Sequence, residues 1–166
     1  MKTFKNIPIT LLGATQKVGN KAPNFKALGQ DLSEKQLTDF TSPYIVLNVV
    51  PSLDTGVCDM QTRTVNQDLV SRDDVLVITI SNDLPFAQAR WCGNAGLNNV
   101  ITLSDHRDLD FSNKYGTNIK EFRLQARSVF VLDEKRNIIY LEYLDEMTHH
   151  INYDSLINFV KQLPKK

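Results

Sequence analysis

Tyr44-Ile-Val-Leu-Asn-Val-Val50 is an almost entirely apolar run that ends at Pro51. A nearly continuous β-branched run of this kind is typical of a strand that is covered on both faces of a sheet. Residues 74–80 form a second such run, and residues 59–71 between the two runs are typical of a helix. A strand, a crossover of more than about a dozen residues and a second strand predict a right-handed βαβ unit.

The segments on either side of this unit are predicted to extend the sheet and to cover it. We expect a short hairpin at residues 4–12 and a brief helical turn that opens at residues 31–34. The further expected elements are a helix at 85–92, a strand at 99–103, a helix at 109–115, an antiparallel hairpin of strands at 127–132 and 138–144, and a helix at 153–163. This order predicts an α/β fold with a mixed β-sheet flanked by helices and an N-terminal β-hairpin.

The composition is that of an ordinary globular chain without a dominant charge. It has 166 residues, 42% of them hydrophobic, and its 19 Lys and Arg residues balance its 19 Asp and Glu residues. This length matches one domain of about 100–200 residues, so we expect residues 1–166 to form a single domain. Because a zero net charge provides no basic field for phosphates, nucleic acid is not an expected partner.

The apolar stretches are too short for a membrane helix, which needs about 20 residues. The stretch at residues 7–14 is interrupted by Pro8 and Thr10, which favours a strand over a secretory signal. We therefore expect a cytoplasmic protein with no membrane partner. The cysteines, Cys58 and Cys92, are too few for a disulfide-rich scaffold or a four-thiolate zinc site. In a reducing compartment such a pair favours a catalytic or redox-sensing role.

Cys58 is predicted to lie where the first strand passes into a helix. The carboxyl ends of strands are where open α/β sheets place their sites. With Thr55 or Asp54 as the N-cap, the Cys58 sulfur lies in the first turn, near unpaired backbone N–H groups and the positive end of the helix dipole. That position favours the thiolate, which is the nucleophilic form, whereas the charge of the adjacent Asp59 opposes it.

The alternative is that Cys58 is a small buried residue without reactivity, since free cysteine is among the most buried residue types. The stretch also carries a hydroxyl donor, Thr55, and a rigid residue, Pro51. Both would help to hold a thiolate in a small pocket, so we favour the reactive interpretation.

Cys92 is expected to be the weaker nucleophile of the two. It lies before Gly93 at the predicted C-terminus of a short helix, where the dipole disfavours a negative charge. That helix has little intrinsic stability and is able to unfold at low cost. A disulfide needs Cα atoms within about 7 Å, so its formation is expected to involve such unfolding. The spacing excludes a C-x-x-C site, and two unrelated buried cysteines are the alternative.

Metal and nucleotide sites have little support in the sequence. His149 and His150 follow an acidic pair, but His106 is the one further histidine, and no thiolate lies near them in sequence. Neither a G-x-G-x-x-G nor a phosphate-loop motif occurs. We expect no cofactor and no metal.

Two segments resemble a known family. Pro51-Ser-Leu-Asp-Thr-Gly-Val-Cys58 matches the peroxiredoxin P-x-x-x-T-x-x-C motif and is similar to the thiol peroxidase subfamily, the atypical 2-Cys peroxiredoxins. Ser81-Asn-Asp-Leu-Pro-Phe-Ala-Gln-Ala-Arg-Trp-Cys-Gly93 is similar to the segment around that subfamily's resolving cysteine. The resemblance covers essentially the whole chain and implies a thioredoxin-like fold.

The resemblance also implies a role for each site residue. Cys58 would attack a hydrogen peroxide or alkyl hydroperoxide and become a sulfenic acid, and Cys92 would resolve it as an intramolecular disulfide. Thr55 would hydrogen-bond the thiolate and the peroxide, Pro51 would shield the sulfur, and Arg127 would favour the thiolate and orient the peroxide. Thioredoxin as the reductant and a homodimer are further implications.

Asp59 and Trp91 depart from the subfamily's pattern. Asp59 stands where a small residue is expected, and Trp91 replaces a phenylalanine, a change expected to affect packing only. The leading hypothesis is a thioredoxin-dependent peroxidase. The alternatives are a peroxide-responsive redox switch without efficient turnover and a thiol-disulfide oxidoreductase acting on proteins, the latter disfavoured because no C-x-x-C occurs.

Overall fold

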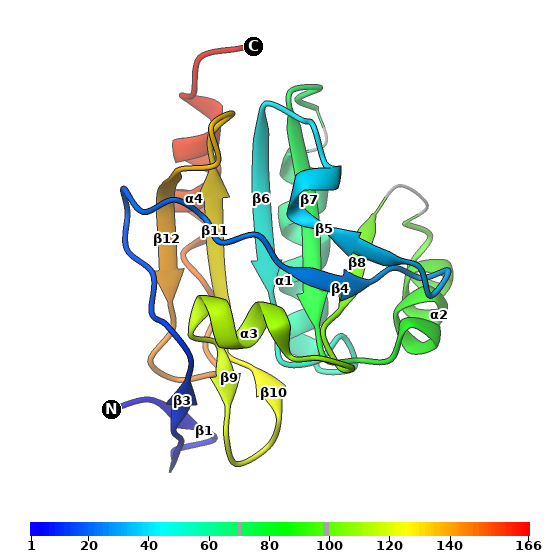
Figure 1. Ribbon diagram of the computed structural model, residues 1–166, viewed down its shortest axis with the longest axis vertical. Coiled ribbons are helices and arrows are strands. Elements are labelled where there is room, and N and C mark those ends of the chain that lie inside the picture. Colours follow the sequence, from blue (N-terminus) through cyan, green and yellow to red (C-terminus); the bar gives the residue numbers. More distant parts are fainter. Residues whose placement is uncertain (70, 98–99) are drawn as a thin grey trace.

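A mixed sheet of seven strands forms the centre of the computed structural model, which describes residues 1–69, 71–97 and 100–166. Its strands are β4 (Lys26–Leu28), β5 (Glu34–Gln36), β6 (Tyr44–Val49), β7 (Val75–Ser81), β8 (Ile101–Ser104), β11 (Ser128–Leu132) and β12 (Ile138–Tyr143). They are ordered β12-β11-β6-β7-β8-β4-β5 (Figure 1). The mixed sheet predicted from the sequence is thus confirmed.

The parallel part of the sheet is the βαβ arrangement expected from the two apolar runs. Strand β6 pairs in parallel with β7, and β7 pairs in parallel with β8. Helix α1 (Gly56–Leu69) connects β6 to β7, and helix α2 (Pro85–Ala95) connects β7 to β8. Strand β11 pairs antiparallel with both β6 and β12, and β4 pairs antiparallel with both β8 and β5.

Helices cover both faces of this sheet (Figure 1). Helix α1 and the C-terminal helix α4 (Tyr153–Lys161) pack on one face, where their apolar residues meet Val46 of β6 and Val77 of β7. Helix α3 (Asp110–Tyr115) packs on the other face, and a 3-10 turn, η1 (Leu37–Asp39), follows β5. Helix α2 lies beside β8.

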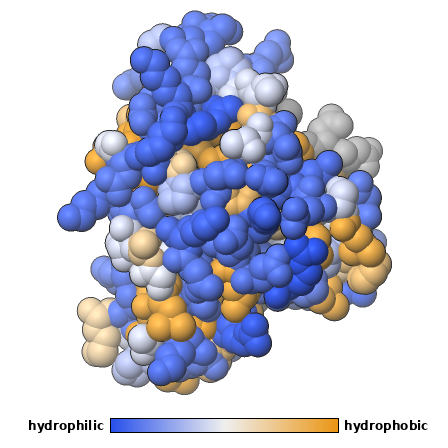
Figure 2. All heavy atoms as spheres, viewed as in Figure 1, coloured by the Kyte–Doolittle hydropathy of each residue, from blue (hydrophilic) through white to orange (hydrophobic). Residues whose placement is uncertain are grey.

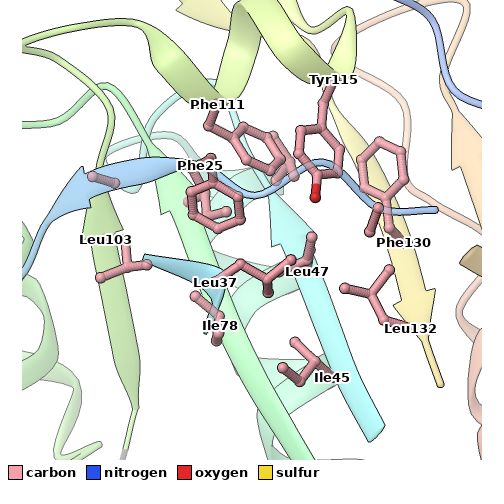
Figure 3. Close-up of a cluster of buried hydrophobic side chains, with 14 of the residues drawn as sticks. Phe25, Leu37, Ile45, Leu47, Ile78, Leu103, Phe111, Tyr115, Phe130 and Leu132 are labelled. Carbon is pink, nitrogen blue, oxygen red and sulfur yellow. The ribbon is translucent and has the colours of Figure 1, made fainter. Parts of the chain in front are cut away.

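The alternation of side chains along β6 supplies both cores. Ile45, Leu47 and Val49 point to the α3 face, whereas Val46 points to the face of α1 and α4. The α3 face contains stacked and edge-to-face aromatic rings, shown with their aliphatic neighbours in Figure 3. These rings are Phe25, Phe111, Tyr115 and Phe130. A strand buried on both faces explains why the run from Tyr44 to Val50 is almost continuously apolar.

Short strands at the N-terminus and after α3 form two small sheets that are separate from the seven-stranded sheet. Strands β1 (Thr3–Phe4) and β2 (Ile7–Pro8) form the predicted N-terminal hairpin. Strand β3 (Leu11–Leu12) instead pairs with β9 (Asn118–Ile119), which also pairs with β10 (Leu124–Gln125). The predicted hairpin at 4–12 is therefore two separate pairings.

Several predictions differ from the structure in detail, and the C-terminal helix, for example, ends at Lys161 rather than at residue 163. Residues 31–34 form the turn between β4 and β5 rather than a helical turn, because the Asp31 carboxylate accepts hydrogen bonds from the backbone and hydroxyl of Ser33. Helix α1 begins three residues earlier than predicted, at Gly56. Helix α2 continues past Cys92 to Ala95, and Gly96 ends it with a left-handed backbone, φ 68°. Residue 70 of the predicted helix 59–71 and residue 99 of the predicted strand lie outside the described residues.

Most of the surface in Figure 2 is hydrophilic, with two gatherings of hydrophobic side chains. One is at the lower end of the view, where the N-terminal hairpin and β9–β10 lie, and the other is on the right, over α2. In the described part of the chain, the helices are all too short or too polar to cross a lipid bilayer.

Glu146 fastens the N-terminal hairpin to the rest of the molecule. Its carboxylate accepts hydrogen bonds from the Thr3 hydroxyl, the Thr148 hydroxyl and the backbone N–H groups of Lys5 and Asn6. These donors, the Thr3 hydroxyl above all, lower the pKa of Glu146 from 4.5 to about 2. The ionised form therefore stabilises the folded state.

We predict that Glu146→Gln removes part of the acid sensitivity of folding. A carboxyl whose pKa is lower in the folded state contributes stability above its unfolded pKa, and the contribution is lost as pH falls from 4.5 towards 2. Urea unfolding between pH 2 and 6 is the measurement. The free energy of unfolding is expected to fall less steeply below pH 4.5 in Glu146→Gln than in the parent. The exposed Glu134→Gln serves as the control, and equal slopes for all three proteins would contradict the prediction.

Candidate active site

Cys58 lies in the first turn of α1, as its position in the sequence predicts. The backbone N–H of Asp59 donates to the carbonyl of Thr55 at 2.9 Å, so Thr55 is the residue that precedes the helix. The Cys58 side chain is fully buried, in a small apolar cluster with Val50 and Leu53. The thiol is thus held between the end of β6 and the start of α1.

Arg127 brings a positive charge to this thiol from the neighbouring strand. It directly precedes β11, which pairs with β6, and it is only 2% exposed. Its Nη2 donates to Cys58 Sγ at 3.0 Å, its Nη1 to Gln61 Oε1 at 2.9 Å, and its Nε to the carbonyl of Met147 at 2.8 Å. Three separate acceptors therefore fix the plane of the guanidinium against the sulfur.

Polar side chains beneath the arginine hold Gln61 in place. Gln61 Nε2 donates to Asn48 Oδ1 at 2.6 Å, and Asn48 Nδ2 donates to the hydroxyls of Thr62 and Thr79 at 3.2 and 3.1 Å. All four side chains are buried. With its amide N–H engaged by Asn48, Gln61 presents its oxygen to the arginine.

Asp83 holds the loop that leads into α1. Its Oδ1 accepts from the Ser52 hydroxyl at 2.7 Å, and its Oδ2 accepts from the backbone N–H of Leu53 at 2.8 Å and from the Ser81 hydroxyl at 2.7 Å. The loop after β6 is thereby tied to the end of β7. The carboxyl ends of these two parallel strands shape the site together.

Pro51 and Thr55 flank this loop. Pro51 is buried two residues after the end of β6, whereas Thr55 is exposed, and the Thr55 hydroxyl donates to the carbonyl of Ser52 at 3.3 Å. The expected contact of Thr55 with the thiolate and the peroxide therefore stays a prediction. So does the shielding of the sulfur by Pro51.

Cys92 lies in the last turn of α2 with hydrogen-bond partners of its own. Gln30 Nε2, from the turn between β4 and β5, donates to Cys92 Sγ at 3.5 Å and to Thr102 Oγ1 at 2.8 Å. Burial raises the pKa of the Cys92 thiol, although hydrogen bonds from Gln30 and Thr102 lower it in part. The weaker nucleophilicity expected of Cys92 stays a prediction. Cys58 and Cys92 are both free thiols.

The Asp59 carboxylate is turned towards two donors. Its Oδ1 accepts from Trp91 Nε1 at 2.8 Å, and its Oδ2 accepts from Arg63 Nε at 2.9 Å. The charge expected to disfavour the thiolate is therefore compensated by Arg63. The expectation that Trp91 affects packing only is incomplete, because its indole N–H bonds to α1.

This arrangement suits nucleophilic attack by sulfur on a small electrophile. The buried Cys58 sulfur lies in the first turn of a helix and accepts a hydrogen bond from a fixed guanidinium, so its surroundings are electropositive. The same guanidinium is able to stabilise negative charge that develops on an oxygen bound near the sulfur. A second thiol on a short helix is available for a later disulfide.

Comparisons with known proteins agree with this chemistry. Residues 17–157 match the family described as Redoxin. The structure superposes on a peroxiredoxin-like protein from Aquifex aeolicus with a TM-score of 0.90 and 37% identity, covering 98% of this chain and 96% of the other. Thiol peroxidase of Oceanobacillus iheyensis is 51% identical over 160 residues, 96% of this chain and 98% of the relative. Thiol peroxidase of Bacillus subtilis is 53% identical over 163 residues, 98% of each chain. The chain belongs to the thiol peroxidase family.

Membership in the thiol peroxidase family confirms the resemblance drawn from the two cysteine segments, and with it the thioredoxin-like fold. The structure brings Arg127 to Cys58, and it places Pro51 and Thr55 in the loop before α1. The Cys92 sulfur accepts a hydrogen bond from Gln30 and is not bonded to Cys58.

Sequence reasoning missed the residues that hold the arginine. Asn48 could have been identified from the sequence, because a polar residue inside an apolar strand needs a buried hydrogen-bond partner. Gln61 lies three residues after Cys58, and both residues belong to α1, which starts earlier than predicted. This spacing places the Gln61 side chain on the same face of the helix as Cys58. Met147 contributes a backbone carbonyl and carries no signal in its side chain. Asp83 lies within the second cysteine segment, but nothing in the sequence indicates that it holds the loop before α1.

We predict that Arg127→Met slows the reaction of Cys58 with hydrogen peroxide by about 100-fold, the scale seen when one donor to a developing oxyanion is removed. Arg127→Lys is expected to restore little, because an ammonium lacks the fork that reaches both Cys58 and Gln61. Single-turnover peroxide consumption measures both. The exposed Arg123→Met controls for loss of charge, and a rate within threefold of the parent for Arg127→Met would rule out this role.

Proposed function

We propose that this member of the thiol peroxidase family reduces hydrogen peroxide and alkyl hydroperoxides at Cys58. The observation that carries the proposal is the 3.0 Å hydrogen bond from Arg127 Nη2 to the fully buried Cys58 Sγ. The site gathers no acidic or metal-ligating cluster around the sulfur among the described residues. The Cys58 sulfur, which the guanidinium faces, is the reacting atom in this proposal.

The first step is attack of the Cys58 thiolate on the terminal oxygen of the hydroperoxide. A sulfur–oxygen bond forms and the O–O bond breaks, so the thiolate is oxidised to a sulfenic acid. The remaining oxygen leaves as water or an alcohol after it takes up a proton. Arg127 lies where it is able to stabilise the thiolate and the leaving oxygen in turn, because its Nη2 already faces the sulfur.

The second step joins the two cysteines. The Cys92 sulfur attacks the sulfenic sulfur, the S–O bond breaks, water leaves and an intramolecular Cys58–Cys92 disulfide remains. Cys92 lies in a helix of 11 residues whose last turn is closed by Gly96, so a local opening of this helix suffices to free it.

Thioredoxin is the proposed reductant of this disulfide. Two electrons and two protons return both cysteines to thiols, and a dithiol protein of low reduction potential supplies them. We place the cycle in the cytoplasm, where thioredoxin is kept reduced.

A redox switch without efficient turnover is the second candidate. The hydrogen bond from Gln30 to Cys92 and the raised pKa of that thiol favour it, because both delay the second step. In this alternative the disulfide would persist as a signal.

We predict that Cys58→Ser abolishes hydroperoxide consumption with thioredoxin, its reductase and NADPH. Cys92→Ser is expected to reduce about one equivalent and then stop, because the sulfenic acid has no resolving thiol. Continuous NADPH oxidation and a single-turnover peroxide assay measure the two outcomes. Turnover by Cys58→Ser would reverse the assignment of roles. A wild type that forms the disulfide without turnover would support the switch.

A homodimer is part of the proposal. Leu84 and Phe86, at the start of α2, are 52% and 67% exposed, and Met60 of α1 is 51% exposed. Exposed apolar groups of this size are typical of surfaces that bind another protein. Phe86→Glu is expected to shift sedimentation equilibrium from dimer to monomer, whereas Leu12→Glu, at another exposed apolar position, is expected to leave it unchanged.

A further inference from the structure

Two residues that each lie beside a cysteine, Asp59 and Trp91, contact each other. Asp59 follows Cys58 on α1, and Trp91 precedes Cys92 on α2. Trp91 Nε1 donates to Asp59 Oδ1 at 2.8 Å, and Arg63 Nε donates to Asp59 Oδ2 at 2.9 Å. The three side chains, Asp59, Arg63 and Trp91, are called the inter-helix clasp below.

Arg63 strengthens the clasp from the α1 side. Its guanidinium carbon lies 5.5 Å from the centre of the Trp91 ring, and its Nη1 is 3.5 Å from the carbonyl of Ala95, the last residue of α2. A cation over an indole face and a donor at a helix C-terminus are both favourable. Through these contacts α1 holds α2 at Trp91 and again at the end of the helix.

The clasp keeps the two cysteines with separate partners. The Trp91 ring packs against the cluster that contains Cys58. Cys92 is the next residue, and successive helical side chains point about 100° apart, so its sulfur faces Gln30 and Thr102 instead. The Cys92 sulfur must leave Gln30 before it bonds to Cys58. While Trp91 stays bonded to Asp59, the last two turns of α2 are held back from that movement.

We propose that Asp59, Arg63 and Trp91 are positioning residues that set how often α2 opens, and thereby how fast Cys92 reaches the Cys58 sulfenic acid. This inference rests on the proposed function of the two cysteines. The residues do not touch the reacting oxygen; they act through the position of Cys92.

The chemical consequence is a competition for the sulfenic acid. Attack by Cys92 breaks the S–O bond and releases water, and the disulfide formed is reducible. In the competing reaction a second hydroperoxide transfers one oxygen to the sulfenic sulfur, which leaves a sulfinic acid and releases water or an alcohol. A closed clasp lengthens the life of the sulfenic acid and favours the sulfinic acid.

The opening of α2 is measured by alkylation of Cys92 in a Cys58→Ser background, where Cys92 is the one remaining thiol. Trp91→Phe removes the indole N–H and keeps a ring, and Asp59→Ala removes the acceptor. Each is expected to raise the rate of reaction with iodoacetamide at pH 8 by about fivefold to tenfold, the effect of losing one ordinary hydrogen bond. The exposed Asp68→Ala on the same helix is the matched control and is expected to leave the rate unchanged.

The double variant Asp59→Ala, Trp91→Phe decides whether the two residues act together. If the two residues act through one shared hydrogen bond, the alkylation rate of Cys92 in the double variant is no higher than in either single variant. Rates within twofold of the parent for both single variants would overturn the proposal, and so would effects that multiply in the double variant. If Asp59→Ala does not fold by circular dichroism, Trp91→Phe alone against Asp68→Ala carries the test.

A second measurement uses the chain with both cysteines. After pulses of hydrogen peroxide, mass spectrometry gives the ratio of sulfinic acid to disulfide, and Trp91→Phe is expected to lower that ratio by about fivefold. An unchanged ratio would contradict the role of the clasp in resolution. The alkylation assay uses neither peroxide nor thioredoxin, so failure of the proposed peroxidase cycle is distinguishable from failure of the clasp.

Discussion

The contact between the Arg127 guanidinium and the Cys58 sulfur is the constraint around which the structure is arranged. A cation that is almost fully buried is costly unless all its donors are engaged. Here the sulfur, the Gln61 oxygen and the Met147 carbonyl engage the three donor groups that the structure describes. The acceptors come from two distant parts of the chain: two from α1 and one from the loop before α4. The sheet, by pairing β11 with β6, makes these parts meet.

The fold was predictable wherever local pattern and tertiary environment agree. The apolar runs of β6 and β7 lie in strands covered on both faces, and the polar loop after β11 closes the expected hairpin. Some of the wrong predictions concern segments in which local hydrogen bonds determine the backbone conformation. Asp31 bonds to Ser33 and makes a turn between strands, although its spacing to Glu34 suggested a helix start. Leu11 and Leu12 pair with β9, more than 100 positions away, which no local pattern could indicate.

The candidate site was predictable to the extent that its residues belong to motifs. Cys58, Thr55 and Pro51 share one short stretch, and Arg127 could be identified by resemblance. The residues that orient Arg127 lie outside the motifs, because they act through an amide oxygen and a backbone carbonyl. Asp59 and Trp91 could each be singled out beside a cysteine, but they are 32 positions apart, and their hydrogen bond is visible only in three dimensions.

Trp91 is the chain's single tryptophan. Its indole is half-buried and bonded to a carboxylate, and its face lies beside a guanidinium. Indole emission is sensitive to water, to neighbouring charge and to hydrogen bonding, and all three change when this ring leaves Asp59. The molecule therefore contains one intrinsic fluorophore at the joint between the two cysteine-bearing helices. Each catalytic cycle that moves α2 would be accompanied by an optical signal, without any label attached.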